Sequence, residues 1–86
     1  MRAADQVATR QFDEETILLD LRGGNYFGLD ETAGAIWERL NRGMSPQEIA
    51  DQLVGTYEVE RDVLLQDIVR FVDDLLDREL VTELSG

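Results

Sequence analysis

The stretch TILLDLRGGNYFGLDETAGAIWERL, residues 16–40, changes the spacing of its apolar residues halfway along. Its first part alternates between two faces, with Ile17, Leu19 and Leu21 on one and Leu18, Asp20 and Arg22 on the other. A period of two is typical of a half-buried strand. Gly23 and Gly24 then stand where a two-residue type I′ hairpin turn needs positive φ, so residues 25–29 are predicted to return as an antiparallel strand. From Leu29 on, the apolar spacing becomes three and four, which indicates a helix.

Three helices are predicted after the hairpin, at about residues 31–42, 46–54 and 60–78. The first takes Asp30 as its N-cap and Gly43 as its C-terminal stop. The second begins with the capping box Ser45-Pro46-Gln47-Glu48 and is expected to end at Gly55. The third carries an apolar arc of about 160°, which is more than one small sheet and two short helices need to cover.

The region before residue 16 completes the predicted sheet. Residues 6–12 alternate weakly, and the acidic residues 13–15 separate them from the next strand, so the sheet spans about residues 6–29 and has two or three strands. Strands followed by helices predict an α+β fold, here three antiparallel strands and three helices in a winged helix-turn-helix-like arrangement. The whole chain, residues 1–86, is expected to form one domain that ends in a short extended piece at Leu80 and Val81.

Composition limits the partners. The chain contains nineteen Asp and Glu but only eight Arg and no Lys, His or Cys, so its net charge is −11. Such a field repels nucleic acid and anionic membranes and favours neutral or basic partners. The chain has no apolar run of about 18 residues, and its N-terminus has no apolar signal region. We therefore expect a cytoplasmic protein that binds neither membrane nor nucleic acid.

The sequence offers little material for catalysis. Gly23 and Gly28 have the glycine spacing of a phosphate-binding loop, but Leu29 and Asp30 follow where Lys and Ser or Thr are needed. Asp30 would repel a phosphate at the start of the helix. The absence of His and Cys removes the commonest general base and the best nucleophile, and no EF-hand spacing is present. The predictions are accordingly no enzyme, no cofactor and no metal.

Three helices after a hairpin also fit a winged-helix DNA-binding regulator. Residues 58–79 carry eight acidic residues and three arginines, however, so the solvent side of the third helix is acidic. A helix in the major groove must approach phosphates, which this charge opposes. A structural acidic module that binds another protein through the wide apolar arc stays open as a further class.

The run NYFGLDETAGAIWERL, residues 25–40, resembles the PqqD family. The resemblance continues through MSPQEIADQL at residues 44–53, Tyr57-Glu58-Val59 and a C-terminal helix ending in Leu80-Val81. The family pattern joins a strand, an L-[ND]-x-T-[AG] helix start and an [ST]-x-x-E-I second helix, and this order is fairly specific. Members are RiPP recognition elements, small winged-helix-like domains that bind the leader segment of a ribosomally made precursor peptide.

The resemblance implies that the leader adds as a further strand to the edge of the last strand, beside the third helix. The stretch G-x-Y-[FY]-x-L-[ND] and the free-standing length are most similar to the recognition proteins of lasso peptide biosynthesis, which serve a leader peptidase. A PqqD-type peptide chaperone for a radical SAM enzyme is the alternative. The implied peptide-binding residues are Asn25, Tyr26, Phe27, Gly28 and Leu29 for the edge, Leu64 and Phe71 for an apolar groove, and Asp67, Arg70 and Asp74 for its polar rim. Which side of the third helix faces the strand stays open.

Overall fold

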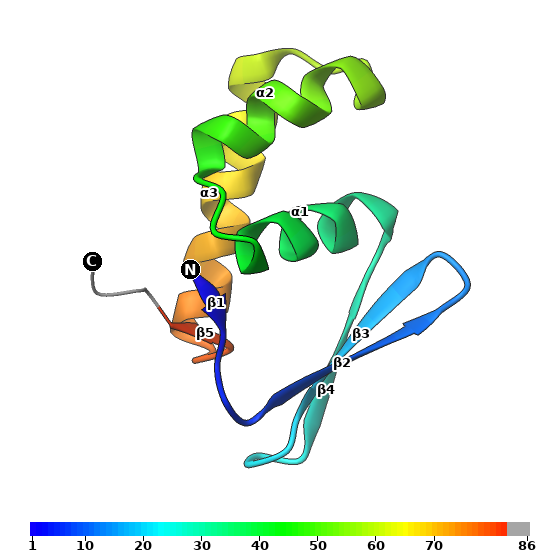
Figure 1. Cartoon of the computed structure of the whole chain (residues 1–86), viewed down its shortest axis with the longest axis vertical. Coiled ribbons are helices and arrows are strands. Elements are labelled where there is room, and N and C mark those ends of the chain that lie inside the picture. The colour runs from blue at the N-terminus through cyan, green and yellow to red at the C-terminus, as the bar shows by residue number, and fades with distance from the viewer. Residues whose placement is uncertain (83–86) are drawn as a thin grey trace.

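The computed structural model describes residues 1–82 (Figure 1). Its elements are β1 (Arg2–Ala3), β2 (Val7–Phe12), β3 (Glu15–Asp20), β4 (Asn25–Leu29), α1 (Glu31–Asn41), α2 (Pro46–Tyr57), α3 (Arg61–Asp77) and β5 (Val81–Thr82). The predicted fold class is confirmed, because β2, β3 and β4 form a three-stranded antiparallel sheet in that order and three helices follow. Residues 83–86 of the predicted domain lie outside the described residues.

A second, two-stranded sheet joins the two ends of the described chain. β1 pairs with β5 in antiparallel register, Arg2 opposite Thr82 and Ala3 opposite Val81. The extended piece expected at Leu80 and Val81 therefore has a partner at the N-terminus, which the sequence did not predict. This pairing places the end of α3 next to the start of the main sheet.

The face of β3 that packs against the helices is the less apolar one. Leu18 is fully buried at the centre of the core, and Thr16 on the same face is also buried. Ile17 and Leu19 lie on the opposite face and are only half-buried, while Leu21 is 69% exposed. The pattern of alternation identified the strand, but the contacts with the helices select which face is inside.

The hairpin between β3 and β4 differs from the predicted two-residue turn. Asp20 pairs with Asn25, so the loop has the four residues 21–24, and of its two glycines only Gly24 has positive φ, at 74°. The cause is Asp20, which organises the loop. Its carboxylate accepts hydrogen bonds from the Arg22 N–H (3.1 Å) and the Gly23 N–H (3.2 Å), and its carbonyl accepts one from the Gly24 N–H (2.8 Å).

The predicted caps of the helices are confirmed at three ends. Asp30 accepts a hydrogen bond from the Ala33 N–H at the start of α1 (2.8 Å), and Ser45 and Glu48 form the reciprocal capping box of α2. Gly43, with φ of 88°, follows the end of α1 and donates to the Leu40 carbonyl (3.0 Å). This is one of the two hydrogen bonds of a Schellman motif, a common helix stop.

The predicted end of the second helix at Gly55 is wrong. α2 continues through Gly55 to Tyr57 and ends at Glu58, which takes the left-handed conformation with φ of 48°. Val54 and Tyr57 are partly buried against the core. Packing of this last turn outweighs the roughly 1 kcal/mol that a glycine inside a helix costs.

Replacing Gly55 by alanine should therefore stabilise the protein by about 0.5–1 kcal/mol. No atom lies within 4 Å of an added Cβ at this position, so the methyl group meets no steric obstacle. Urea unfolding followed by circular dichroism measures the change. Gly43→Ala is the control with the opposite sign, since its positive φ is unfavourable for alanine. A loss of stability in Gly55→Ala would contradict a helical last turn.

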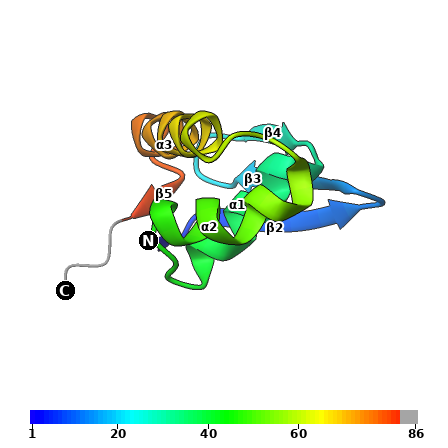
Figure 2. The ribbon, with the colours of Figure 1, turned by 90° about the horizontal axis from the view of Figure 1, so that it is seen from above.

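The helices form the core together with one face of the sheet. Viewed from above, α3 lies on the β4 side of the molecule and β2 on the opposite side (Figure 2). Trp37 of α1 is buried, and its Nε1 donates to Thr9 Oγ1 (3.2 Å). Asp51 of α2 accepts a hydrogen bond from Arg61 at the start of α3, which raises the pKa of that guanidinium.

Within residues 1–82 every helix is too short or too polar to traverse a bilayer.

Candidate functional site

Along β4, the N–H and C=O groups of alternate residues bond to β3, and those of the residues between them point away from the sheet. The Leu21 N–H donates to the Gln6 carbonyl (2.9 Å), which continues the ladder between β2 and β3. Because antiparallel ladders alternate, residues 15, 17 and 19 of β3 bond to β2, and residues 16, 18 and 20 bond to β4. In the β3–β4 register, residues 25, 27 and 29 then bond back to β3. Tyr26 and Gly28 therefore direct their N–H and C=O groups away from the sheet.

The opposite edge of the sheet, on β2, is partly closed by the protein itself. The same alternation turns the main-chain groups of Val7, Thr9 and Gln11 outward. The Val7 N–H donates to the Ala4 carbonyl (3.0 Å), and the Arg10 guanidinium donates to the Thr9 carbonyl (2.9 Å). Within residues 1–82 no hydrogen bond of this kind covers the outward groups of Tyr26 or Gly28. Among the described residues, β4 is thus the edge whose outward groups have no such partner, whereas β2 is closed at Val7 and Thr9 but not at Gln11.

A groove of about 240 Å³ runs along β4 and is closed on its other side by α3. Its upper walls are formed by Phe27, Gly28, Leu29, Phe71, Asp74 and Arg78. Leu18, Leu75 and Leu80 form a buried apolar floor. The Arg78 guanidinium lies 5.1 Å from the centre of the Phe27 ring, a cation–π contact that joins the strand to the end of the helix.

Five of the ten predicted site residues line this groove, namely Phe27, Gly28, Leu29, Phe71 and Asp74. The strand residues 25–29 form β4, and Phe71 and Asp74 face β4 across the groove. Asp67 and Arg70 are exposed and precede Phe71 and Asp74 by one turn, so they extend the same side of α3. Leu64 is 3% exposed and belongs to the core below.

These positions settle which side of α3 faces the strand. It is the side of Phe71 and Asp74, whereas Val69 lies on the other margin of the helix and is 43% exposed. Sequence reasoning missed Arg78, although it follows Asp74 by four residues and Phe71 by seven. Helical spacing from Phe71 was the signal that could have found it.

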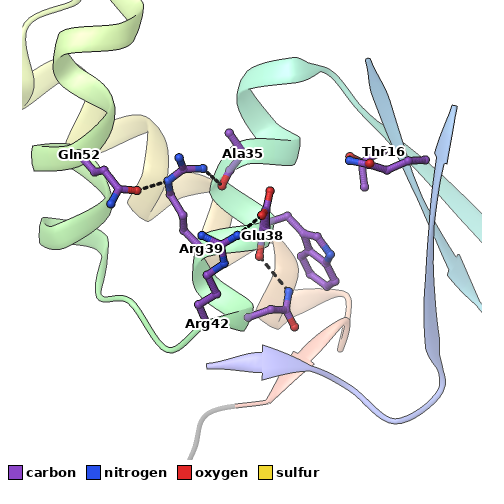
Figure 3. Close-up of polar contacts among 9 residues, drawn as sticks. Thr16, Ala35, Glu38, Arg39, Arg42 and Gln52 are labelled. Carbon is purple, nitrogen blue, oxygen red and sulfur yellow. Dashed lines mark hydrogen bonds and ion pairs between the residues drawn. The ribbon is translucent and has the colours of Figure 1, made fainter. Parts of the chain in front are cut away.

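A larger cavity of about 470 Å³ lies between β2 and α1, but its polar groups are already engaged (Figure 3). Arg42 pairs with Glu38. The Asn41 side chain donates to the Trp37 carbonyl (2.9 Å) and accepts from the Ala3 N–H (2.7 Å). This cavity borders the partly closed edge of the sheet and its polar groups have partners, so the β4 groove is the stronger candidate. No group of three or more His, Cys, Asp or Glu side chains suited to a metal ion occurs in the described chain.

An open strand edge beside an apolar groove, on a winged-helix-like α+β domain, is the architecture of a small peptide-recognition domain. Residues 15–81 match the family described as coenzyme PQQ synthesis protein D (PqqD). The chain belongs to the PqqD family, and the resemblance inferred from residues 25–40 is confirmed.

Similar proteins include one curated relative and two solved structures. A PqqA binding protein of Bradyrhizobium diazoefficiens (strain USDA 110) is 32% identical over 54 residues, which cover 63% of this chain; the chain spans about half, 52%, of that relative. The structure of TbiB1 in complex with the TbiA(beta) leader peptide has 35% identity and a TM-score of 0.88, with 100% of both chains covered. A lasso peptide synthetase B1 complexed with the leader peptide has 35% identity and a TM-score of 0.89, covering 95% of this chain and 96% of that one.

Proposed function

We propose that this protein is a RiPP recognition element that binds the leader segment of a precursor peptide by adding it as a strand to β4. The observation that carries the proposal is the open edge at Tyr26 and Gly28 beside the groove of Phe27 and Phe71. In strand addition the main-chain hydrogen bonds supply affinity, and pockets for alternate side chains supply specificity. The two similar structures, both leader peptide complexes, support this function. As a member of the PqqD family the protein is a recognition protein and not an enzyme.

Each proposed binding residue has a distinct part in this function. Residues 25–29 supply the edge, and Phe71 contacts the leader side chains that turn into the groove. Asp67, Arg70 and Asp74 form the polar rim on α3, where the two carboxylates favour a neutral or basic leader. Leu64 contributes indirectly, since it is buried in the core that holds α3 in place.

For the enzyme that receives the leader, we propose a leader peptidase of lasso peptide biosynthesis. The match to a lasso peptide synthetase B1 over nearly all of both chains supports this assignment. A PqqD-type chaperone for a radical SAM enzyme is the second candidate, favoured by the similarity to a PqqA binding protein. Neighbouring genes distinguish them, since a transglutaminase-like peptidase with an asparagine-synthetase-like cyclase indicates the first and a radical SAM enzyme the second.

Titration with the leader peptide encoded beside the gene should shift amide signals at residues 25–29 and along residues 67–78. The largest shifts are expected at Tyr26 and Gly28, whose N–H groups would donate to the leader. Nuclear magnetic resonance of the ¹⁵N-labelled protein measures them. The absence of binding at micromolar peptide would refute the proposal, and binding to duplex DNA instead would favour a regulator.

A matched pair of variants tests the groove in the same titration. Phe71→Ser should weaken leader binding about tenfold or more, because a buried aromatic side chain contributes about 1.5–3 kcal/mol. Val69→Ser on the other margin of α3 should have no effect. Equal losses in both variants would mean that α3 does not present Phe71 to the leader.

A further inference from the structure

The face of the sheet that is turned away from the helices is apolar and exposed. We call it the outer sheet face; by the strand register it consists of Ala8, Arg10 and Phe12 of β2, Glu15, Ile17 and Leu19 of β3, Tyr26 and Gly28 of β4, and Leu21 just after β3. Phe12, Leu21 and Tyr26 are 66%, 69% and 73% exposed, the highest values among the large apolar residues described. The sheet projects from the helical part, and the β2–β3 hairpin extends beyond α1 (Figure 1).

These side chains form one continuous surface rather than scattered exposed residues. Ile17 stands between Arg10 and Gly28 in register, and Leu19 stands between Ala8 and Tyr26. Directly opposed residues on one face of a sheet lie about 4.5–5.5 Å apart, so their side chains touch. A contiguous exposed apolar surface marks an interaction site, whereas single exposed apolar residues do not.

The charge on this face is unusual for a chain of net charge −11. Arg10 is the charged residue in its middle, and the acids are confined to one end, at residues 13–15 of the hairpin tip. A second copy of the chain would bring its own acidic tip and its own net charge of −11 to the contact, which opposes pairing of two such faces. The pattern suits a protein with an apolar surface and basic residues beside it.

The outer sheet face is continuous with the proposed leader site. Tyr26 and Gly28 direct their main-chain groups toward the added leader strand. By register they also belong to the outer sheet face, since they stand opposite Leu19 and Ile17. Side chains of an added strand alternate, so half of them enter the groove and half join the outer sheet face. The nearest atom to a Cβ at Gly28 would be Ile17 Cδ1 at 3.9 Å, which leaves a shallow hollow next to the leader.

We propose that the outer sheet face docks the processing enzyme, which then contacts the sheet and one side of the bound leader together. The enzyme's contacting surface is apolar, with basic residues opposite the acidic tip at residues 13–15. This inference rests on the proposed function, because the leader strand completes the docking surface. It accounts for an exposed apolar face on a protein of a family of recognition proteins.

The test uses the full chain, the leader peptide and the processing enzyme encoded beside the gene. The double variant Phe12→Ser/Leu21→Ser removes two strongly exposed apolar side chains of the outer sheet face that do not line the groove, and Val69→Ser removes an exposed apolar side chain of α3 as the matched control. We expect the leader affinity of both variants to stay within about twofold of the wild-type value. Enzyme affinity should fall about tenfold or more in the double variant alone, as expected when large apolar side chains of an interface are truncated. Leader peptide should also raise the affinity of the wild-type protein for the enzyme.

The other outcomes are equally decisive. Unchanged enzyme affinity in the double variant, or no binding of enzyme by the leader-bound wild type, overturns the docking proposal. A wild-type dimer in light scattering that Phe12→Ser abolishes would assign the face to a second copy instead. If the wild type binds no leader but its enzyme binding depends on Phe12 and Leu21, the proposed function fails, and the outer sheet face docks the enzyme without a contribution from the leader. If the wild type binds neither the leader nor the enzyme, both the proposed function and the docking proposal are wrong.

Discussion

Replacing Gly28 by proline is expected to lower leader affinity by about 100-fold or more, which corresponds to about 2.7 kcal/mol. Gly28 is one of two residues of β4 whose N–H groups point to the open edge. Proline removes this donor and leaves the opposing carbonyl of the leader without its partner, while its ring occupies the space where the leader strand would lie. The fold should persist, since an edge strand tolerates proline where its N–H faces solvent. Fluorescence anisotropy of a labelled leader peptide measures the affinity.

Two further substitutions separate loss of the donor from loss of structure. Gly28→Ala keeps the N–H, and its Cβ would lie at an ordinary contact distance of 3.9 Å from Ile17, so leader affinity should stay near that of wild type. Phe27→Pro removes an N–H that bonds to β3 and should reduce the thermal stability of the free protein. If Phe27→Pro stayed stable and lost the leader, while Gly28→Pro still bound it, the assignment of outward groups would be wrong.

Signals that act within a few residues made the elements predictable. Asp30 accepts from an N–H three residues later, and Ser45 and Glu48 bond reciprocally over the same distance, so both helix starts are visible in the sequence. Gly55 also resembles a local stop signal, but the burial of Tyr57 carries the helix past it. The hairpin loop escaped prediction because the side chain of Asp20 organises it.

The strand of the candidate site could be predicted from the sequence, but the side of α3 that faces this strand could not. The period-two pattern and the register of a hairpin are local, and they identified residues 25–29. The side of α3 that meets β4 depends on how the helix lies on the sheet, which involves contacts far apart in the chain. Phe71 lies close to Phe27 in space while 44 positions separate them along the chain. The outer sheet face was hidden for the same reason, since Ile17 and Leu19 form the more apolar side of β3 and yet lie outside.

Gly34 shows how such a distant contact can restrict a single position. It lies in α1 and faces Thr16 of β3, which is 3% exposed. A Cβ at Gly34 would lie 2.7 Å from Thr16 Oγ1 and 3.4 Å from Thr16 Cβ. Nothing in the local sequence indicates this approach, because glycine in the first turns of a helix normally only weakens it.

Gly34→Ala should therefore destabilise the protein by about 1–3 kcal/mol, the usual cost of adding a methylene to a well-packed core. Helix propensity alone predicts the opposite sign, a gain of up to about 1 kcal/mol, so the direction of the change identifies the cause. The substitution Thr16→Ala removes the obstructing Oγ1, and the double variant Gly34→Ala/Thr16→Ala should recover most of the loss caused by Gly34→Ala. Urea unfolding of the wild type and the three variants gives the coupling free energy between the two positions. A neutral or stabilising Gly34→Ala in the wild-type background would show that α1 does not approach β3 this closely in solution.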